Sequence, residues 1–109
     1  MSEEKTRVIP GGGNVFADMG LPNPEELLQK SDLVIALKRN IERMNLTQTE
    51  AAKILGISQA KVSTLLRGRL GGVSVGKLIE LLNRLGCDVD VKVSKSKADA
   101  RGRTRITSA

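Results

Sequence analysis

Residues Leu46 to Gly68 read LTQTEAAKILGISQAKVSTLLRG, and this stretch decides the fold. Thr47 and Glu50 stand three residues apart, the spacing of a capping box, and predict a short helix that starts here. Gly56 ends that helix and allows a tight turn. Ser58 is then placed to cap a second helix. The stretch therefore predicts two short helices joined by a Gly-Ile-Ser turn.

The second of these helices is expected from Gln59 to about Arg67, because Gly68 stops it. Its apolar residues Val62, Leu65 and Leu66 are spaced for burial on one face. The residues left exposed on the other face are Gln59, Ala60, Lys61, Ser63, Thr64 and Arg67.

Two longer amphipathic helices are expected on either side of this stretch. The first covers residues 23–44, with Asn23 as its cap and Pro24 in the first helical position. Its buried stripe is Val34, Leu37, Ile41 and Met44. The other runs from a Ser74 cap through Leu85, and its buried face is Leu78, Leu81, Leu82 and Leu85.

A short strand is expected over residues 87–94, where apolar and polar residues alternate. A single strand cannot satisfy its own backbone hydrogen bonds, and no second strand is evident in the chain. We expect the same strand of a second copy to pair with it, with Val89, Val91 and Val93 in the interface of a two-fold dimer. The alternatives are packing on the chain's own helices and pairing with a different protein.

The two ends of the chain have different compositions from the middle. Residues 1–22 are expected to be flexible, with a few apolar side chains that either pack back on the body or bind a partner. Residues 23–94 form the domain, and residues 95–109 are expected to be a disordered basic tail. The candidate partner-binding residues are Val15, Phe16, Met19, Leu27 and Leu28.

Composition argues against an enzyme or a metal protein. The chain has 109 residues, one Phe, no Trp or Tyr, one Cys and no His. It therefore lacks a Cys/His zinc site and a Cys–His nucleophile pair, and it carries no phosphate-binding loop. We expect no cofactor. A lone cysteine, no membrane-spanning stretch and no signal peptide favour a soluble, cytoplasmic protein.

Charge is unevenly distributed along the chain. Residues 1–46 carry six basic and seven acidic side chains, residues 47–86 six and two, and residues 87–109 six and three. The middle and the tail thus supply the net charge of +6. A positive field suits a polyanion such as nucleic acid, although charge alone would equally fit a solubilising surface.

The exposed face of the second short helix has the chemistry of base recognition. Gln59 can pair with adenine, Lys61 with guanine, and the Thr64 methyl can touch thymine. A solvated helix face would account for each residue alone, but capped helices, a glycine turn and the lack of any acidic residue between Ala51 and Ile79 coincide here. The combination predicts a helix-turn-helix with its second helix in the major groove of DNA. The candidate DNA-binding residues are Gln48, Thr49, Ser58, Gln59, Ala60, Lys61, Ser63, Thr64, Arg67 and Arg69.

The same stretch resembles the Cro/C1 or XRE family of helix-turn-helix regulators, which includes relatives of phage lambda repressor. The match runs from LTQTEAA through LGISQ to VS and the final RG without a gap. The resemblance implies an all-α, five-helix domain of the lambda-repressor type, to which we add the short C-terminal β-strand. It also implies that Gln48 touches the DNA backbone and that residues 59–61, 63 and 64 face bases.

A narrower resemblance covers residues 14–94. NVFADMGLP at residues 14–22, the long helix, the regulator core and the short strand after Gly86 are similar to the HigA-type antitoxins. This resemblance implies a RelE/HigB-like toxin as partner and repression of the shared operon. We therefore predict a homodimeric repressor of a palindromic operator, with a solitary regulator as the alternative. A further hypothesis is that the basic tail dominates binding to nucleic acid, including RNA.

Overall fold

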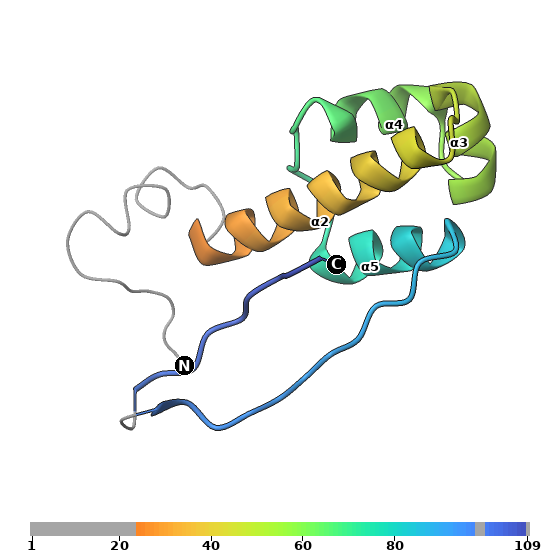
Figure 1. The fold of residues 1–109 in the computed structure, drawn as a ribbon. Helices are drawn as coiled ribbons and strands as arrows, with labels where there is room; N and C mark the ends of the chain where they lie inside the picture. The colour runs from red at the N-terminus through yellow and green to blue at the C-terminus, as the bar shows by residue number, and fades with distance from the viewer. Residues whose placement is uncertain (1–23, 98–99, 109) are drawn as a thin grey trace.

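Four helices make up the regular structure of the described part of the chain. The computed structural model describes residues 24–97 and 100–108. The helices are α2 (Pro24–Arg43), α3 (Gln48–Leu55), α4 (Gln59–Leu66) and α5 (Val75–Arg84), as Figure 1 shows. The predicted Asn23 cap lies outside the described residues, as do the candidate partner-binding residues Val15, Phe16 and Met19.

The long helix α2 is the centre of the arrangement. It packs against α4 on one side and α5 on the other, while α3 packs against α4 and α5 (Figure 1). Within the described ranges, none of the helices is long and apolar enough to span a lipid bilayer. The short helices α3 and α4 thus pack on the two longer helices, α4 on α2 and α3 on α5.

The core is built from aliphatic side chains of all four helices and of the loop after α4. Leu37, Leu55, Leu65, Leu78 and Leu81 are each only 1% exposed. The loop contributes Leu70 and Val73, which are also buried. The predicted buried faces are confirmed, except that Leu66 is only partly buried and Met44 is exposed.

Met44 departs from the predicted buried stripe because α2 ends one residue before it. Asn45 takes a left-handed conformation with φ 57°, which an α-helix cannot continue. The amide of Leu46 then donates to the carbonyl of Ile41 at 3.1 Å, and that of Asn45 to Glu42 at 3.0 Å. This termination leaves Met44 46% exposed.

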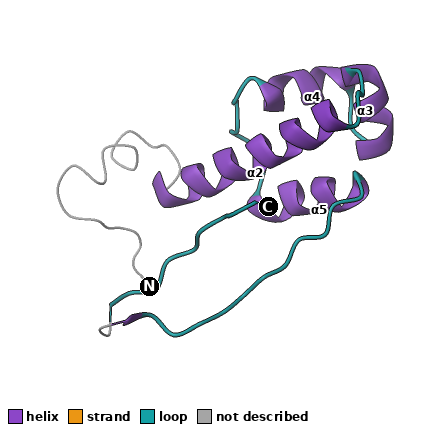
Figure 2. Cartoon of the chain, in the orientation of Figure 1, coloured by secondary structure: helices purple, strands orange, loops and turns teal. Residues whose placement is uncertain are grey.

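The predictions of a fifth helix and of a C-terminal strand are not met in the described residues. Figure 2 shows helices and loops there, and residues 87–94 form an extended segment without strand pairing. The physical reason is that the described residues supply no second strand with which the backbone groups of this segment could pair. The described fold is therefore all-α.

The end of the chain returns to the beginning of the domain. After the extended segment, residues 100–108 run back along α2 toward the start of α5 (Figure 1). Ile106 is partly buried and packs against the core. The basic residues of this segment remain exposed.

Candidate nucleic-acid interface

The start of α3 is held by the predicted capping box. The Glu50 amide donates to Thr47 Oγ1 at 3.1 Å, and the Thr47 amide donates to Glu50 Oε1 at 2.8 Å. These hydrogen bonds satisfy donors that would otherwise lack a partner at a helix N-terminus. The Thr47 amide and then the Thr47 side chain hydrogen-bond to the Glu50 carboxylate and hold its pKa below the ordinary value, because they favour the charged form. The first turn of α3 is consequently firmly placed.

The turn between α3 and α4 has the predicted form. Gly56 has φ +72°, and its amide donates to the carbonyl of Ala52 at 2.8 Å. Ile57 follows and packs against the core. Ser58 then caps α4, because its hydroxyl oxygen accepts from the Lys61 amide at 3.0 Å. The three residues turn the chain sharply while both helix ends stay satisfied.

A side-chain hydrogen bond joins the first residues of the two short helices. Gln59 Nε2 donates to Gln48 Oε1 at 3.0 Å, and both side chains are exposed. The two residues were predicted as separate DNA contacts, and the structure brings them together. The bond orients the Gln59 amide at the N-terminal end of α4.

The remaining candidate residues of α4 differ in how far they reach solvent. Ala60 is exposed beside Gln59, whereas Lys61, Ser63 and Thr64 are half-buried. Thr64 Oγ1 donates to the carbonyl of Ala60 at 2.9 Å, so its hydroxyl proton is already used. The accessible chemistry of Thr64 is therefore its methyl group and its oxygen lone pairs.

The cationic residues lie at the end of α4 and in the loop that follows. Arg67 caps α4, and both Arg67 and Arg69 are exposed. The nearest acidic residues along the chain are Glu50 and Glu80. Glu50 is bonded to Thr47, and Glu80 forms ion pairs with Lys77 and Arg84, both at 3.4 Å. The loop after α4 is thus positively charged, with no acidic side chain of its own.

Arg84 supports this region and was not predicted from the sequence. Its Nη1 would lie 2.9 Å from a Cβ at Gly56, so the guanidinium sits directly against the turn. A cation is favourable there, because the C-terminal end of α3 carries partial negative charge. Arg84 is distant from Gly56 in the chain, and only the tertiary fold brings the two together.

The described residues of the two other candidate sites differ in burial. Leu27 packs against the core, whereas Leu28 is 62% exposed. In the predicted strand, Val89 also packs on the core, while Val91 and Val93 are 78% and 89% exposed. The exposed members of each set remain available to a partner.

Two capped helices at a glycine turn, with polar side chains along the second, define a helix-turn-helix protein of the DNA-binding class. A family model described as a helix-turn-helix domain matches residues 15–94, and the chain belongs to this family. A solved structure described as a candidate XRE family transcriptional regulator is 40% identical in sequence. The match covers 81% of this chain and 100% of that chain, with a TM-score of 0.75. The protein is thus an XRE-type helix-turn-helix regulator. No curated protein shows significant similarity to it.

Proposed function

We propose that the protein is a dimeric transcriptional repressor that inserts α4 into the major groove of a palindromic operator. The observation that carries this proposal is the hydrogen bond between Gln59 and Gln48. A solvated glutamine would lose side-chain freedom on binding DNA, whereas this one is already oriented. The pairing therefore favours a role of this helix face in DNA recognition over a solvent-exposed polar surface without a binding role.

The bond also selects what each glutamine can do. Gln59 spends one amide proton on Gln48, which leaves its other proton and its carbonyl oxygen. These form the donor and acceptor pair that matches N7 and N6 of adenine in the major groove. Gln48 keeps both of its amide protons, which suit a phosphate oxygen. Gln59 is thus the residue that reads a base, while Gln48 orients Gln59 and contacts the DNA backbone.

The neighbouring residues complete the proposed interface. Ala60, Lys61, Ser63 and Thr64 face the bases, with Lys61 donating to guanine and the Thr64 methyl touching thymine. Thr49 and Ser58, at the openings of α3 and α4, lie where short polar groups and amides hold phosphate. Arg67 and Arg69 extend the phosphate contacts beyond the end of α4.

Replacing Gln59 and Lys61 with alanine tests the assignment. Each lost base contact should cost about 1–3 kcal/mol of affinity for the operator, and sequence preference should blur. The measurement is a titration of the DNA upstream of the gene against a random duplex of equal length. Lys92→Ala, which removes one exposed positive charge outside the helix-turn-helix, serves as the control and should affect both duplexes alike.

The supporting role of Gln48 is tested by a double-mutant cycle with Gln59. Gln48→Ala should weaken operator binding in the otherwise unchanged protein and have a smaller effect once Gln59 is alanine, with a coupling of about 0.5–3 kcal/mol. Operator affinity that survives both Gln59→Ala and Lys61→Ala would remove these residues from the base-reading set.

Dimerisation through the extended segment supports the proposal of a palindromic operator. Val91 and Val93 are exposed in a segment whose backbone has no strand partner among the described residues. Antiparallel pairing with a second copy would cover both valines and relate two α4 helices by a two-fold axis. Half-sites about 34 Å apart, one turn of DNA, would then suit the dimer.

We further propose that the regulator is the antitoxin of a type II pair and binds a RelE/HigB-like toxin. The resemblance over residues 14–94 motivates this, and Leu28 and Ile35 on α2 are 62% and 45% exposed. Exposed apolar side chains on this helix would suit a partner surface. The alternative is a solitary regulator of the same family.

Co-expression with the product of the adjacent reading frame separates these two functions. An antitoxin should co-purify with that product and protect cells from it, and a chain lacking residues 1–22 should lose the interaction. Binding that persists without residues 1–22 would move the contact to another surface. Absence of any complex with the full chain would favour the solitary regulator.

A further inference from the structure

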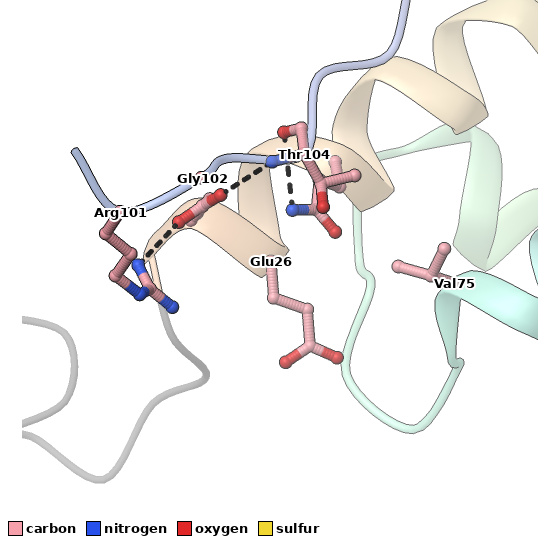
Figure 3. A pocket seen from close by; sticks show the side chains of 7 residues that line it. Glu26, Val75, Arg101, Gly102 and Thr104 are labelled. Atoms are coloured by element: carbon pink, nitrogen blue, oxygen red, sulfur yellow. Dashed lines mark hydrogen bonds and ion pairs between the residues drawn. The ribbon is translucent and has the colours of Figure 1, made fainter. Parts of the chain in front are cut away.

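Residues 101–106 lie on α2 as a strap that takes no part in the helix-turn-helix. The Thr104 amide donates to Glu25 Oε2 at 3.0 Å, and Gln29 Nε2 approaches the Thr104 carbonyl at 3.5 Å. Arg101 Nη1 lies 3.6 Å from Glu25 Oε1. Figure 3 shows Arg101, Gly102 and Thr104 on one side of a small hollow and Val75 on the other, with Glu26 between them.

The sequence of this strap alternates in a way that suits an extended arm. Arg101, Arg103 and Arg105 are spaced two apart, so an extended backbone directs them to the same side. All three side chains are exposed, whereas Ile106, from the other set, packs against the core. The strap therefore holds to the domain through the Thr104 backbone, Ile106 and the pair of Arg101 with Glu25, while Arg103 and Arg105 stay exposed.

The attachment is one that can be reversed. Arg101 is 83% exposed and Glu25 29% exposed in their ion pair, and exposed pairs of this kind contribute little. Thr104 adds two hydrogen bonds to α2, one to Glu25 and one from Gln29. Glu25 and Glu26 give the start of α2 a negative charge that phosphate groups of DNA could replace as the partner of the arginines.

We propose that residues 101–106 form a basic arm that is held on the acidic start of α2 in the free protein and moves to DNA phosphates when the helix-turn-helix binds DNA. The acidic residues of α2 then compete with DNA for the arm. This inference rests on DNA binding by α4, which the proposed function describes. It assigns the basic C-terminal segment a role in affinity rather than in reading the sequence.

The arm is long enough to make this move. Cys87 is anchored, because its amide donates to Leu82 at 2.9 Å and its carbonyl accepts from Asn83 Nδ2 at 3.0 Å. The chain from residue 87 to residue 101 spans up to about 45–50 Å when extended. The described molecule is 44 Å in its longest dimension. A chain of this length leaves room for Arg101 to move away from α2 without disturbing α5.

The test uses the full chain with Thr104→Pro, which removes the amide proton donated to Glu25 and changes no charge. The variant should bind a random-sequence duplex about two- to tenfold more tightly at low salt, because the arm is no longer held on α2. Thr107→Pro is the matched control, since it places the same ring beyond Thr104 and Ile106. It should leave the affinity unchanged.

A triple variant with Arg101, Arg103 and Arg105 replaced by Gln removes the charges with which the arm would bind DNA. It separates the effect of these charges from the effect of releasing the arm from α2. Its salt slope, the change of log affinity with log salt concentration, should be shallower by about 1–3. Thr104→Pro should have no effect in this background. An equal gain in both backgrounds, or no gain in either, would overturn the proposal.

Nuclear magnetic resonance distinguishes failure of this inference from failure of the proposed function. On addition of the duplex, the Thr104 amide should lose its hydrogen-bonded shift while the amides of α4 move. Movement in α4 with an unchanged Thr104 would refute the arm and leave the helix-turn-helix assignment intact. No change in either region would contradict both.

Discussion

Gly56 carries the strictest local requirement in the candidate interface. Its φ of +72° lies in the left-handed region, where a side chain costs about 1–2 kcal/mol. A Cβ at this position would also meet Arg84 Nη1 at 2.9 Å. Two separate effects, backbone conformation and the space taken by Arg84, therefore favour glycine at the turn.

Gly56→Ala should lower the free energy of unfolding by about 1–3 kcal/mol, measured by thermal or urea denaturation. Gly68→Ala is the matched control, because Gly68 has φ +83° and no neighbouring atom within 4 Å of its Cβ position. It should show the backbone cost alone. We expect Gly56→Ala to lose more stability than Gly68→Ala, and equal losses would mean that Arg84 moves aside freely.

At the scale of the element, α3 is stabilised by a carboxylate that must be charged. Glu50 accepts the Thr47 amide proton, and this hydrogen bond is the main cause of its lowered pKa. A pKa that is lower in the folded than in the unfolded chain means that ionised Glu50 stabilises the fold. The cap of α3 is therefore a pH-dependent part of the helix-turn-helix.

Comparing the unchanged protein with Glu50→Gln across pH should reveal this dependence. The stability difference should be fully present above the ordinary glutamate pKa of 4.5 and should shrink as the pH falls through the lower pKa of the folded state. The measurement is urea denaturation at a series of pH values. A difference that is the same at neutral and at acidic pH would contradict the assigned role of the charge.

The sequence predicted the elements of the helix-turn-helix well because their signals are local. Thr47, Gly56 and Ser58 each act within a few residues of the chain, and all three have the predicted roles. Features that depend on tertiary contacts were not predictable in this way. Arg84 against the turn is one, and the burial of Lys30, which is only 6% exposed, is another.

The pairing of Gln48 with Gln59 shows the same limit within the candidate site. Both residues were expected to contact DNA, but no sequence pattern specifies that their side chains meet. Their contact depends on the angle between α3 and α4, which the Gly56 turn and the core beneath it set together. Base recognition by these residues stays a prediction until DNA binding is measured.

At the scale of the whole molecule, residues 87–94 are the part whose structure is least determined by the single chain. Alternating apolar and polar residues predicted a strand over residues 87–94, and in the part of the chain that the structure describes this segment is extended and unpaired. A strand forms only when its backbone groups have hydrogen-bond partners in a second strand. Without a second chain, the backbone groups of the described residues 88–94 bind water instead. The local pattern is the same in either case, so only the state of assembly decides the structure.

Val91→Asp tests whether that assembly is the proposed dimer. Val91 is 78% exposed in the single chain, so the substitution should leave the domain's thermal stability nearly unchanged. In a strand pair it would bury a charge without a partner and should raise the dimer dissociation constant at least about tenfold. Lys92→Asp is the control, because neighbouring residues of a strand face opposite sides, and it should have a much smaller effect. Light scattering at low micromolar concentration measures the outcome, and a Val91→Asp protein that remains fully dimeric there would place the interface on another surface.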